Sequence, residues 1–376
     1  MMDIDWKKIR SNYPVLDKCT YLNTASSGAI SKGTAEVMKT FAEDQLNNAT
    51  LNRSNWIATI EESRNNTAKL INAAISEVAF TPDVSIAMSF TAQALGHKKT
   101  VAILEDEFPS VVLPWISHAY DISWIKRAED HSFDLSDFEK AIVGGTHVVI
   151  ISWVHYNSGI TTDLETLGQL CKEHGAILVV DATQGLGAIP MDVKKYNISI
   201  LMASTFKWLT GGYGTCVMYV SDEIQSALHH KAMGWNSLVD FGMEPTLQSN
   251  WKTGAPSFEL GHLKYLNLIT FGQALKELQE TGIQNINQRI ESLREYLINS
   301  LGQLDKTPIL RETQQVVSGI ITVAADIELQ KWLTQQNIII TYRENYIRLS
   351  VHFYNDFEDV DRLASAISGY SPSKLS

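Results

Sequence analysis

The sequence contains few cysteines, and none has the spacing of a disulfide or zinc framework. Only Cys19, Cys171 and Cys216 occur among 376 residues, and no two form a CxxC pair. Neither a disulfide scaffold nor a structural zinc site is therefore indicated, and we expect no metal. The chain also lacks an 18-residue apolar run and an apolar segment near its start. We therefore expect a cytoplasmic protein that does not associate with membranes.

Positive charge is scarce as well. The chain has 31 Lys and Arg residues against 42 Asp and Glu, a formal net charge of −11. This balance argues against a nucleic-acid partner. It does not exclude binding of a small anionic ligand, because such binding depends on nearby cations and helix N-termini rather than on net charge.

Several common catalytic motifs are also missing. The sequence has no Walker loop, no G-x-S-x-G elbow and no H-E-x-x-H pair. The segment GLGAIP at 185–190 has Pro190 where a dinucleotide-binding loop needs its third glycine. We therefore do not expect a nicotinamide-dependent oxidoreductase.

Apolar runs alternate with amphipathic segments from about residue 30 to 240. Their hydrophobicity is continuous rather than alternating, which is typical of strands that helices cover on both faces. We predict an α/β domain with strands at 77–81, 100–105, 147–154, 176–182, 198–204 and 214–220. The segment 162–175 is a typical intervening helix, with apolar residues on one face and a glycine at its end.

The pattern changes after about residue 250. A helical stretch at 261–303 precedes a strand at 316–325, a helix at 327–337, a hairpin at 338–353 and a final helix, for which Asn355 and Glu358 resemble a capping box. The length of the chain also favours two domains. We predict an N-terminal helix and arm (1–20), a large α/β domain (21–250) and a smaller α+β domain (251–376).

Two residues of the large domain have the chemistry of a cofactor site. Asp181 ends an apolar strand, and Lys207 lies in a small-residue loop between the next two strands. Ligands of parallel sheets bind beyond the carboxyl ends of the strands, so we expect both side chains at one edge. Pyridoxal phosphate (PLP) chemistry needs such a pair: a lysine for the Schiff base and a carboxylate for the pyridine nitrogen. Alternatively, Asp181 caps a helix or forms a salt bridge, and Lys207 is a surface lysine.

Other polar and aromatic residues lie at strand and helix ends. Ser85 is in the first turn of a predicted helix, where free N–H groups favour a phosphate. Gln184 can donate to a phenolate oxygen, and Phe108 can stack on a flat ring. Arg348, on a strand of the hairpin, can bind a carboxylate with two hydrogen bonds. Each also has an ordinary structural interpretation: a helix cap, a turn residue, a core phenylalanine and an exposed arginine.

Four fragments together resemble the class V aminotransferase family of fold-type-I PLP enzymes, which includes cysteine desulfurases, isopenicillin N epimerase and kynureninase. The fragments are YLNTASSGAI, VVDATQ, TFKWLTGGYG and IRLSVHFYN. The resemblance spans nearly the whole chain. It implies a large domain with a mainly parallel seven-stranded sheet between helices, a smaller C-terminal α+β domain, and a homodimer.

The resemblance also implies roles for individual residues. Lys207 would form the Schiff base with PLP, and Asp181 would pair with the pyridine nitrogen. The other cofactor contacts would come from Val84, Ser85, Phe108, Tyr156, Gln184 and Ser204, and from Ala255 toward the phosphate of the partner subunit. Arg348 would bind the substrate α-carboxylate. Specificity is expected in the segment from Asn23 to Gly28, in 235–241, and at Tyr342 and Arg343.

Three departures from the family pattern bear on the activity. Phe206 stands where a histidine often precedes the lysine, Ala255 replaces a threonine, and Phe108 replaces a ring-stacking histidine. The C-terminal domain has no cysteine, so sulfur transfer through a protein persulfide is disfavoured. We expect an aminotransferase acting on an amino acid. A desulfurase-like lyase, an epimerase and a non-catalytic PLP-binding module remain as alternatives.

Overall fold

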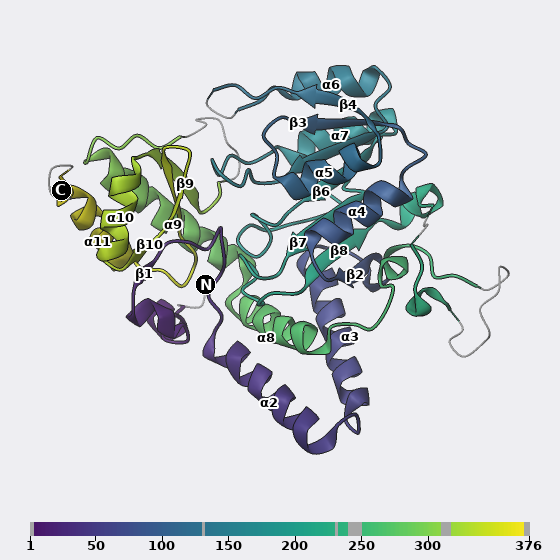
Figure 1. Ribbon diagram of the computed structural model, residues 1–376, viewed down its shortest axis with the longest axis horizontal. Coiled ribbons are helices and arrows are strands. Elements are labelled where there is room, and N and C mark those ends of the chain that lie inside the picture. Colours follow the sequence, from purple (N-terminus) through teal and green to yellow (C-terminus); the bar gives the residue numbers. More distant parts are fainter. Residues whose placement is uncertain (1–3, 130–131, 230–231, 240–249, 310–316, 372–376) are drawn as a thin grey trace.

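The large part of the chain is built around a seven-stranded sheet (Figure 1). The computed structural model describes residues 4–129, 132–229, 232–239, 250–309 and 317–371. The strand order is β2-β8-β7-β6-β5-β3-β4, and β8 alone runs antiparallel to its neighbours. The strands are β2 (Val78–Thr81), β3 (Thr100–Leu104), β4 (Asp121–Ile125), β5 (Val148–Ser152), β6 (Ile177–Asp181), β7 (Ile200–Ser204) and β8 (Cys216–Val220).

Helices cover both faces of this sheet. In β6, Leu178 and Val180 face one apolar core, whereas Ile177 and Val179 face the other. Burial on both faces explains why the strands are apolar throughout rather than at every second position. The helices of this part are α2 (Lys32–Asn48), α3 (Arg53–Leu70), α4 (Val84–Ala94), α5 (Pro109–Ser117), α6 (Leu135–Val143), α7 (Leu164–His174) and α8 (Tyr265–Thr281).

A second, smaller α+β layer lies to the left in Figure 1. Its three-stranded sheet has the order β11-β12-β9, and α9 packs against α11. The elements are α9 (Ile283–Gly302), β9 (Ile320–Ala324), α10 (Ile327–Gln335), β10 (Ile338–Ile339), β11 (Thr341–Arg343), β12 (Tyr346–Ser350) and α11 (Phe357–Ser368).

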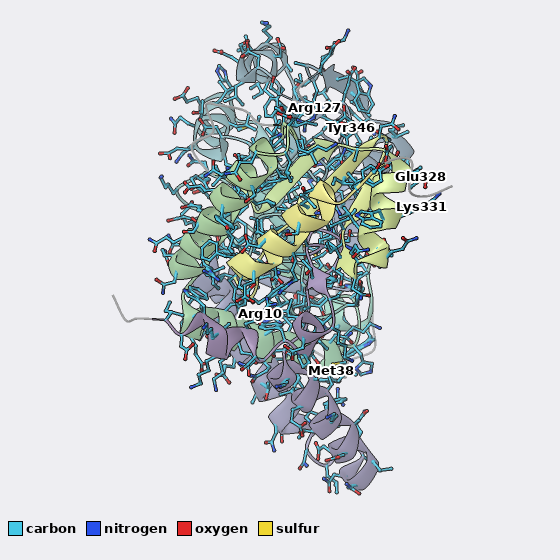
Figure 2. All side chains as sticks on the ribbon, turned by 90° about the vertical axis from the view of Figure 1, so that its left-hand side faces the viewer. Arg10, Met38, Arg127, Glu328, Lys331 and Tyr346 are labelled. Carbon is cyan, nitrogen blue, oxygen red and sulfur yellow. The ribbon has the colours of Figure 1, made fainter. Side chains whose placement is uncertain are left out.

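The N-terminal segment joins this smaller layer. Strand β1 (Thr20–Tyr21) pairs in parallel with β10. Arg10, at the end of α1 (Trp6–Arg10), forms salt bridges with Asp356 at 3.1 Å and with the buried Asp359 at 2.7 Å. Figure 2 views the molecule from this side and shows Arg10 beside the start of the chain. The loop that follows β1 then bridges β12, where Asn23 pairs with Ser350.

The predicted architecture is confirmed, with three corrections of detail. All six predicted strands of the large sheet are present, but the sequence did not indicate β4. This edge strand is largely exposed and lacks a continuous apolar run. The helical stretch at 261–303 is two helices, divided at Gly282 with φ +83°. The capping box of α11 is formed by Asp356 and Asp359, one residue later than predicted.

Helix α8 belongs spatially with the large sheet, because it packs against α2 and α3. The division of the chain at residue 250 stays a prediction. Residue 316, the start of one predicted strand, lies outside the described residues. In the part of the chain that is described, no helix is both long and apolar enough to cross a bilayer.

Candidate active site

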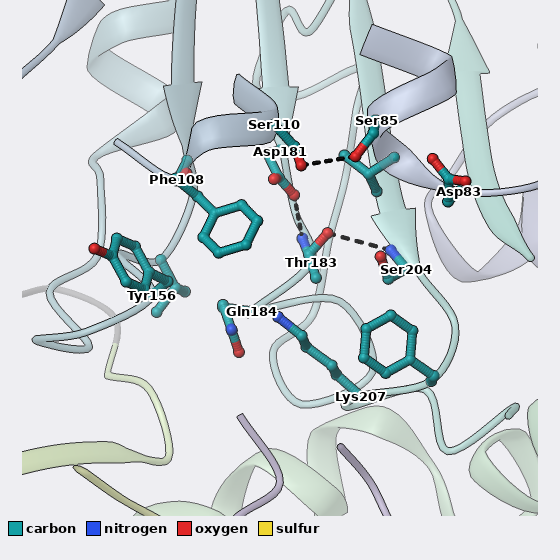
Figure 3. A pocket seen from close by; sticks show the side chains of 14 residues that line it. Asp83, Ser85, Phe108, Ser110, Tyr156, Asp181, Thr183, Gln184, Ser204 and Lys207 are labelled. Atoms are coloured by element: carbon teal, nitrogen blue, oxygen red, sulfur yellow. Dashed lines mark hydrogen bonds between the residues drawn. The ribbon is translucent and has the colours of Figure 1, made fainter. Parts of the chain in front are cut away.

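The carboxyl ends of three neighbouring strands form the floor of a cavity (Figure 3). Ser152, Asp181 and Ser204 are the last residues of β5, β6 and β7. The cavity holds about 650 Å³ including its open mouth, within the roughly 300–1,000 Å³ typical of small-molecule sites. It is lined by Asp83, Val84, Ser85, Phe108, Ser110, Ser152, Val154, Tyr156, Asp181, Thr183, Gln184, Ser204, Phe206 and Lys207.

Asp181 and Lys207 both line this cavity, as predicted, and they influence each other's ionisation. Asp181 is buried, which raises the pKa of its carboxyl, although Thr183 and Lys207 act in the opposite direction. Burial lowers the pKa of the Lys207 amine to about 8, opposed by Asp181 and assisted by Arg348 and Arg343. An amine with a lowered pKa is a better nucleophile near neutral pH. Lys207 is thus a half-buried amine rather than a fully solvated one.

Aromatic rings and a glycine fix the position of Lys207. Its Nζ lies 5.9 Å from the ring centroid of Phe108 and 5.6 Å from that of Phe206. Phe206 stacks on Tyr213 with ring centroids 4.4 Å apart. The Gly28 N–H donates to the Phe206 carbonyl at 2.8 Å, and a Cβ at Gly28 would lie 2.0 Å from the Lys207 carbonyl oxygen. Gly28 thus packs the N-terminal loop against the backbone of the lysine.

The other end of the cavity is suited to an anion. Helices α4 and α5 both begin there, and the Ser85 and Ser110 hydroxyls are hydrogen-bonded at 2.8 Å. Two helix N-termini and their hydroxyls favour a phosphate group. Asp83 caps α4 by accepting from the Ile86 N–H at 2.8 Å. The sequence indicated Ser85. It did not indicate Ser110, which lies in the segment PSVV and has no recognisable motif around it.

Gln184 is held in one orientation by two hydrogen bonds. Its Oε1 accepts from Trp208 Nε1 at 2.8 Å, and its Nε2 donates to the Ala25 carbonyl at 3.0 Å. A primary amide has two N–H groups, so one remains for a ligand in the cavity. His352 in turn contacts the Trp208 carbonyl at 2.9 Å. No sequence pattern indicated that Trp208 supports Gln184.

A buried carboxylate lies behind the floor of the cavity. Glu107 accepts from the Ser152 N–H at 3.0 Å and from its hydroxyl at 2.5 Å, and Arg127 lies 3.7 Å away. Burial raises the pKa of Glu107, with a further small contribution from Asp181. Since Ser152 pairs with Asp181 in the sheet and Phe108 follows Glu107, this carboxylate positions two cavity residues at once.

Arg348, on β12 of the smaller layer, lies beside the cavity but is not among the residues that line it. Its Nη1 donates to the Tyr156 carbonyl at 2.5 Å and its Nη2 to Ser26 Oγ at 2.7 Å. Its Nε is buried and has no hydrogen-bond partner among the described residues. Burial and the neighbouring Arg343 lower its pKa to about 10. A guanidinium beside the cavity is suited to bind the carboxylate of a ligand.

Asn23 belongs to the same hydrogen-bond chain. Thr341 Oγ1 donates to Asn23 Oδ1 at 2.7 Å and lies 2.8 Å from Ser26 Oγ. Since the Thr341 proton points to Asn23, Ser26 donates to Thr341 and accepts from Arg348. Asn23 therefore orients Arg348 rather than lining the cavity itself.

Ala255 does not reach the cavity of its own chain. It lies in the 3-10 turn Ala255–Phe258 with its side chain fully buried in an apolar core. Its expected role concerned the partner subunit and stays a prediction. Residues 240 and 241 of the expected specificity loop lie outside the described residues.

The whole chain is similar to proteins of one family. The family model Aminotransferase class-V matches residues 20–363. The chain belongs to the class V aminotransferase family. Among curated relatives, an uncharacterized aminotransferase, YcbU of Bacillus subtilis, is 29% identical over 94% of this chain and 95% of its own. A probable cysteine desulfurase of Pyrococcus abyssi is 28% identical over 79% of this chain and 76% of its own.

Solved structures share the fold of this class V aminotransferase family member. A cysteine desulfurase from Thermococcus onnurineus superposes with a TM-score of 0.85 at 21% identity, covering 97% of each chain. A variant of C-DES with glycine covalently linked to its PLP cofactor gives 0.88 at 19% identity, covering 96% of this chain and 99% of that one. The predicted fold type and family are thus confirmed.

The cavity also fits the cofactor of the family, PLP. The cofactor carries a pyridine nitrogen, an aldehyde and a phosphate. The cavity offers a buried acid, a lysine with a lowered pKa, and paired helix N-termini with hydroxyls. This protein is accordingly a PLP-dependent enzyme acting on amino acids, as the sequence predicted.

Proposed function

We propose that this protein catalyses transamination between an amino acid and a 2-oxo acid. The observation that carries the proposal is that Lys207 and Asp181 line one cavity, and that Arg348 is held beside it by the carbonyl of Tyr156, which lines the cavity too. A protein that only binds PLP needs no free carboxylate-binding group, so Arg348 favours an enzyme over a binding module.

Each residue has a separate task in this proposal. Lys207 would hold PLP through Nζ and, with its amine free, would take the proton from the substrate Cα and return it. Bound in the cavity, PLP supplies an electron sink that makes this Cα–H acidic. Asp181 would hold the proton on the pyridine nitrogen. Gln184 would donate an N–H to the phenolic oxygen, and Phe108 would pack on the ring.

The remaining residues bind the two anionic groups. Val84, Ser85, Ser110 and Ser204 hold the phosphate at the ends of α4 and β7, with Ser110 added by the structure. Arg348 binds the substrate α-carboxylate and so orients the Cα–H bond toward Lys207. Tyr156 lines the cavity, and its carbonyl accepts a hydrogen bond from Arg348. It therefore connects the proposed cofactor site with the residue assigned to the substrate.

Persulfide-based desulfuration is disfavoured by the cysteines. Cys171 and Cys216 are buried, and burial raises the pKa of each thiol to about 12. Cys19 lies before β1, in the segment that joins the smaller layer. None of the three lines the cavity. We therefore place transamination ahead of sulfur transfer, and we further propose a cytoplasmic homodimer.

The test uses the PLP-loaded protein and a panel of amino acids. Transamination predicts that an amino acid changes the visible spectrum of the bound cofactor, that the matching 2-oxo acid reverses the change, and that Lys207→Ala lowers turnover by about 10³-fold or more. Lys331→Ala, which removes an exposed lysine of α10 (Figure 2), serves as the control and retains activity. Release of alanine and sulfur from cysteine, or racemisation without a 2-oxo acid, would contradict transamination. A spectrum that no amino acid changes would contradict an enzymatic role altogether.

A further inference from the structure

The hairpin that carries Arg348 brings a second arginine to the same residue of the cavity. Arg343 ends β11, opposite Tyr346 of β12. Its Cζ lies 5.4 Å from the ring centroid of Tyr156, and the carbonyl of that tyrosine accepts from Arg348. Tyr156 itself lines the cavity. The two guanidinium groups thus contact one residue, Arg348 at its main chain and Arg343 at its ring.

Arg343 has no salt-bridge partner in the part of the chain that the structure describes. Among the residues that the structure describes, it makes no salt bridge and no side-chain hydrogen bond, and its side chain is exposed. Two acids act on Tyr156 together with Arg343: Asp106, which lies 3.6 Å from His155, and Glu344, the next residue of the hairpin turn. A cation held on an aromatic face without a counter-ion is ready to bind an anion.

The charge of Arg343 also acts on the cavity. It lowers the pKa of both Lys207 and Arg348. The charges of Arg343 and Arg348 therefore both disfavour the charged form of Lys207, whereas Asp181 favours it. A substrate with a single carboxylate, placed on Arg348, leaves the charge of Arg343 uncompensated. A second negative group on the substrate would remove this repulsion.

We propose that Arg343 determines specificity by binding an acidic group of the substrate side chain, so that the substrate is an amino acid with a side-chain carboxylate. The proposal rests on the proposed function, since Arg348 is assigned to the α-carboxylate. The Tyr156 ring holds Arg343 in place and so reduces the entropy that binding costs. A site that pairs a charge in this way discriminates against the neutral amide of the same shape.

The test compares acids with their isosteric amides on the PLP-loaded protein. Affinities of glutamate against glutamine, and of aspartate against asparagine, are measured by spectral titration and by calorimetry at two salt concentrations. We expect at least one acid to bind about tenfold more tightly than its amide, with a preference that falls at high salt. Arg343→Gln should abolish this preference while leaving PLP affinity unchanged, and Arg343→Glu should reverse it.

A matched surface variant controls for the loss of an arginine. Arg53→Gln removes an exposed arginine that donates to the Tyr265 hydroxyl in the distant α3–α8 contact, and it should retain the preference for the acid. Equal affinity for acid and amide in the wild-type protein, or an acid preference that persists in Arg343→Gln, would overturn the proposal. Tighter binding of phosphoserine or cysteate than of either carboxylate would also overturn it, in favour of another anion. A protein that takes up PLP but responds to no amino acid would instead contradict the proposed function.

Discussion

The two halves of the cavity are built in different ways. The half assigned to the cofactor comes from strand ends and helix starts of one sheet, with Asp181, Ser204 and Ser85 placed by the strands themselves. The half assigned to the substrate is assembled from the N-terminal loop and a hairpin more than 300 residues later. There, Arg348 depends on Ser26 and Tyr156 for its position. The first half is fixed by local geometry, and the second by long-range hydrogen bonds.

This difference predicts that variants separate into two groups. Changes in the sheet half should alter cofactor affinity, and changes in the hairpin half should alter substrate affinity alone. Gly28 is the exception, because it lies where the N-terminal loop meets the lysine.

Among variants that keep Lys207, the largest effect is expected for Gly28→Ala. The added Cβ would lie 2.0 Å from the Lys207 carbonyl oxygen, a backbone atom that cannot move aside without displacing the lysine. We expect turnover to fall about 10²-fold and the free energy of unfolding to fall by about 1–3 kcal/mol. Gly302→Ala is the control, since no atom lies within 4 Å of its added Cβ. Full activity in Gly28→Ala would show that the loop does not position Lys207.

Arg348→Lys tests the substrate half alone. A lysine keeps the charge but cannot donate to the Tyr156 carbonyl and Ser26 Oγ in the planar geometry of a guanidinium. We expect KM for the amino acid to rise about thirtyfold, with PLP affinity unchanged. Steady-state kinetics and PLP titration measure the two quantities. An equal loss of PLP affinity would mean that the two halves are not separable.

The ionisation of Lys207 gives a test that needs no cofactor. Its pKa is lowered to about 8, so the neutral amine in the apoprotein should increase as the pH rises through that value. The rate of acylation of Lys207, followed by mass spectrometry, should rise about tenfold between pH 7 and 9. Exposed lysines should still be gaining reactivity above pH 9. A Lys207 profile that matches theirs would mean that burial does not alter this amine.

Trp208→Phe should have the smallest effect, confined to the cofactor half. It removes the donor that orients Gln184. Losing one buried hydrogen bond of about 1 kcal/mol predicts an approximately fivefold higher Kd for PLP. KM for the amino acid should stay the same. Trp153→Phe, which changes a buried indole outside the cavity lining, is the matched control.

The difference between the cofactor half and the substrate half also explains which site residues could be predicted from the sequence. Asp181 and Ser204 each end an apolar strand, and Lys207 comes three residues after one. The sequence alone therefore predicts that all three lie at the same edge of the sheet. Ser110 and Glu107 could not be recognised, because their neighbours in space are distant in sequence. The link from Arg348 to Asn23 through Ser26 and Thr341 likewise depends on tertiary structure. Strand β4 was missed because an exposed edge strand carries a weak apolar signal.

The central claim is that Lys207 binds PLP opposite Asp181. Borohydride reduction of the PLP-loaded protein, followed by peptide mass spectrometry, tests it most directly, because reduction fixes the cofactor to the amine that holds it. We predict that the pyridoxyl group is found on Lys207 and that Asp181→Asn weakens its retention. A label on another lysine, or no label at all, would contradict the account.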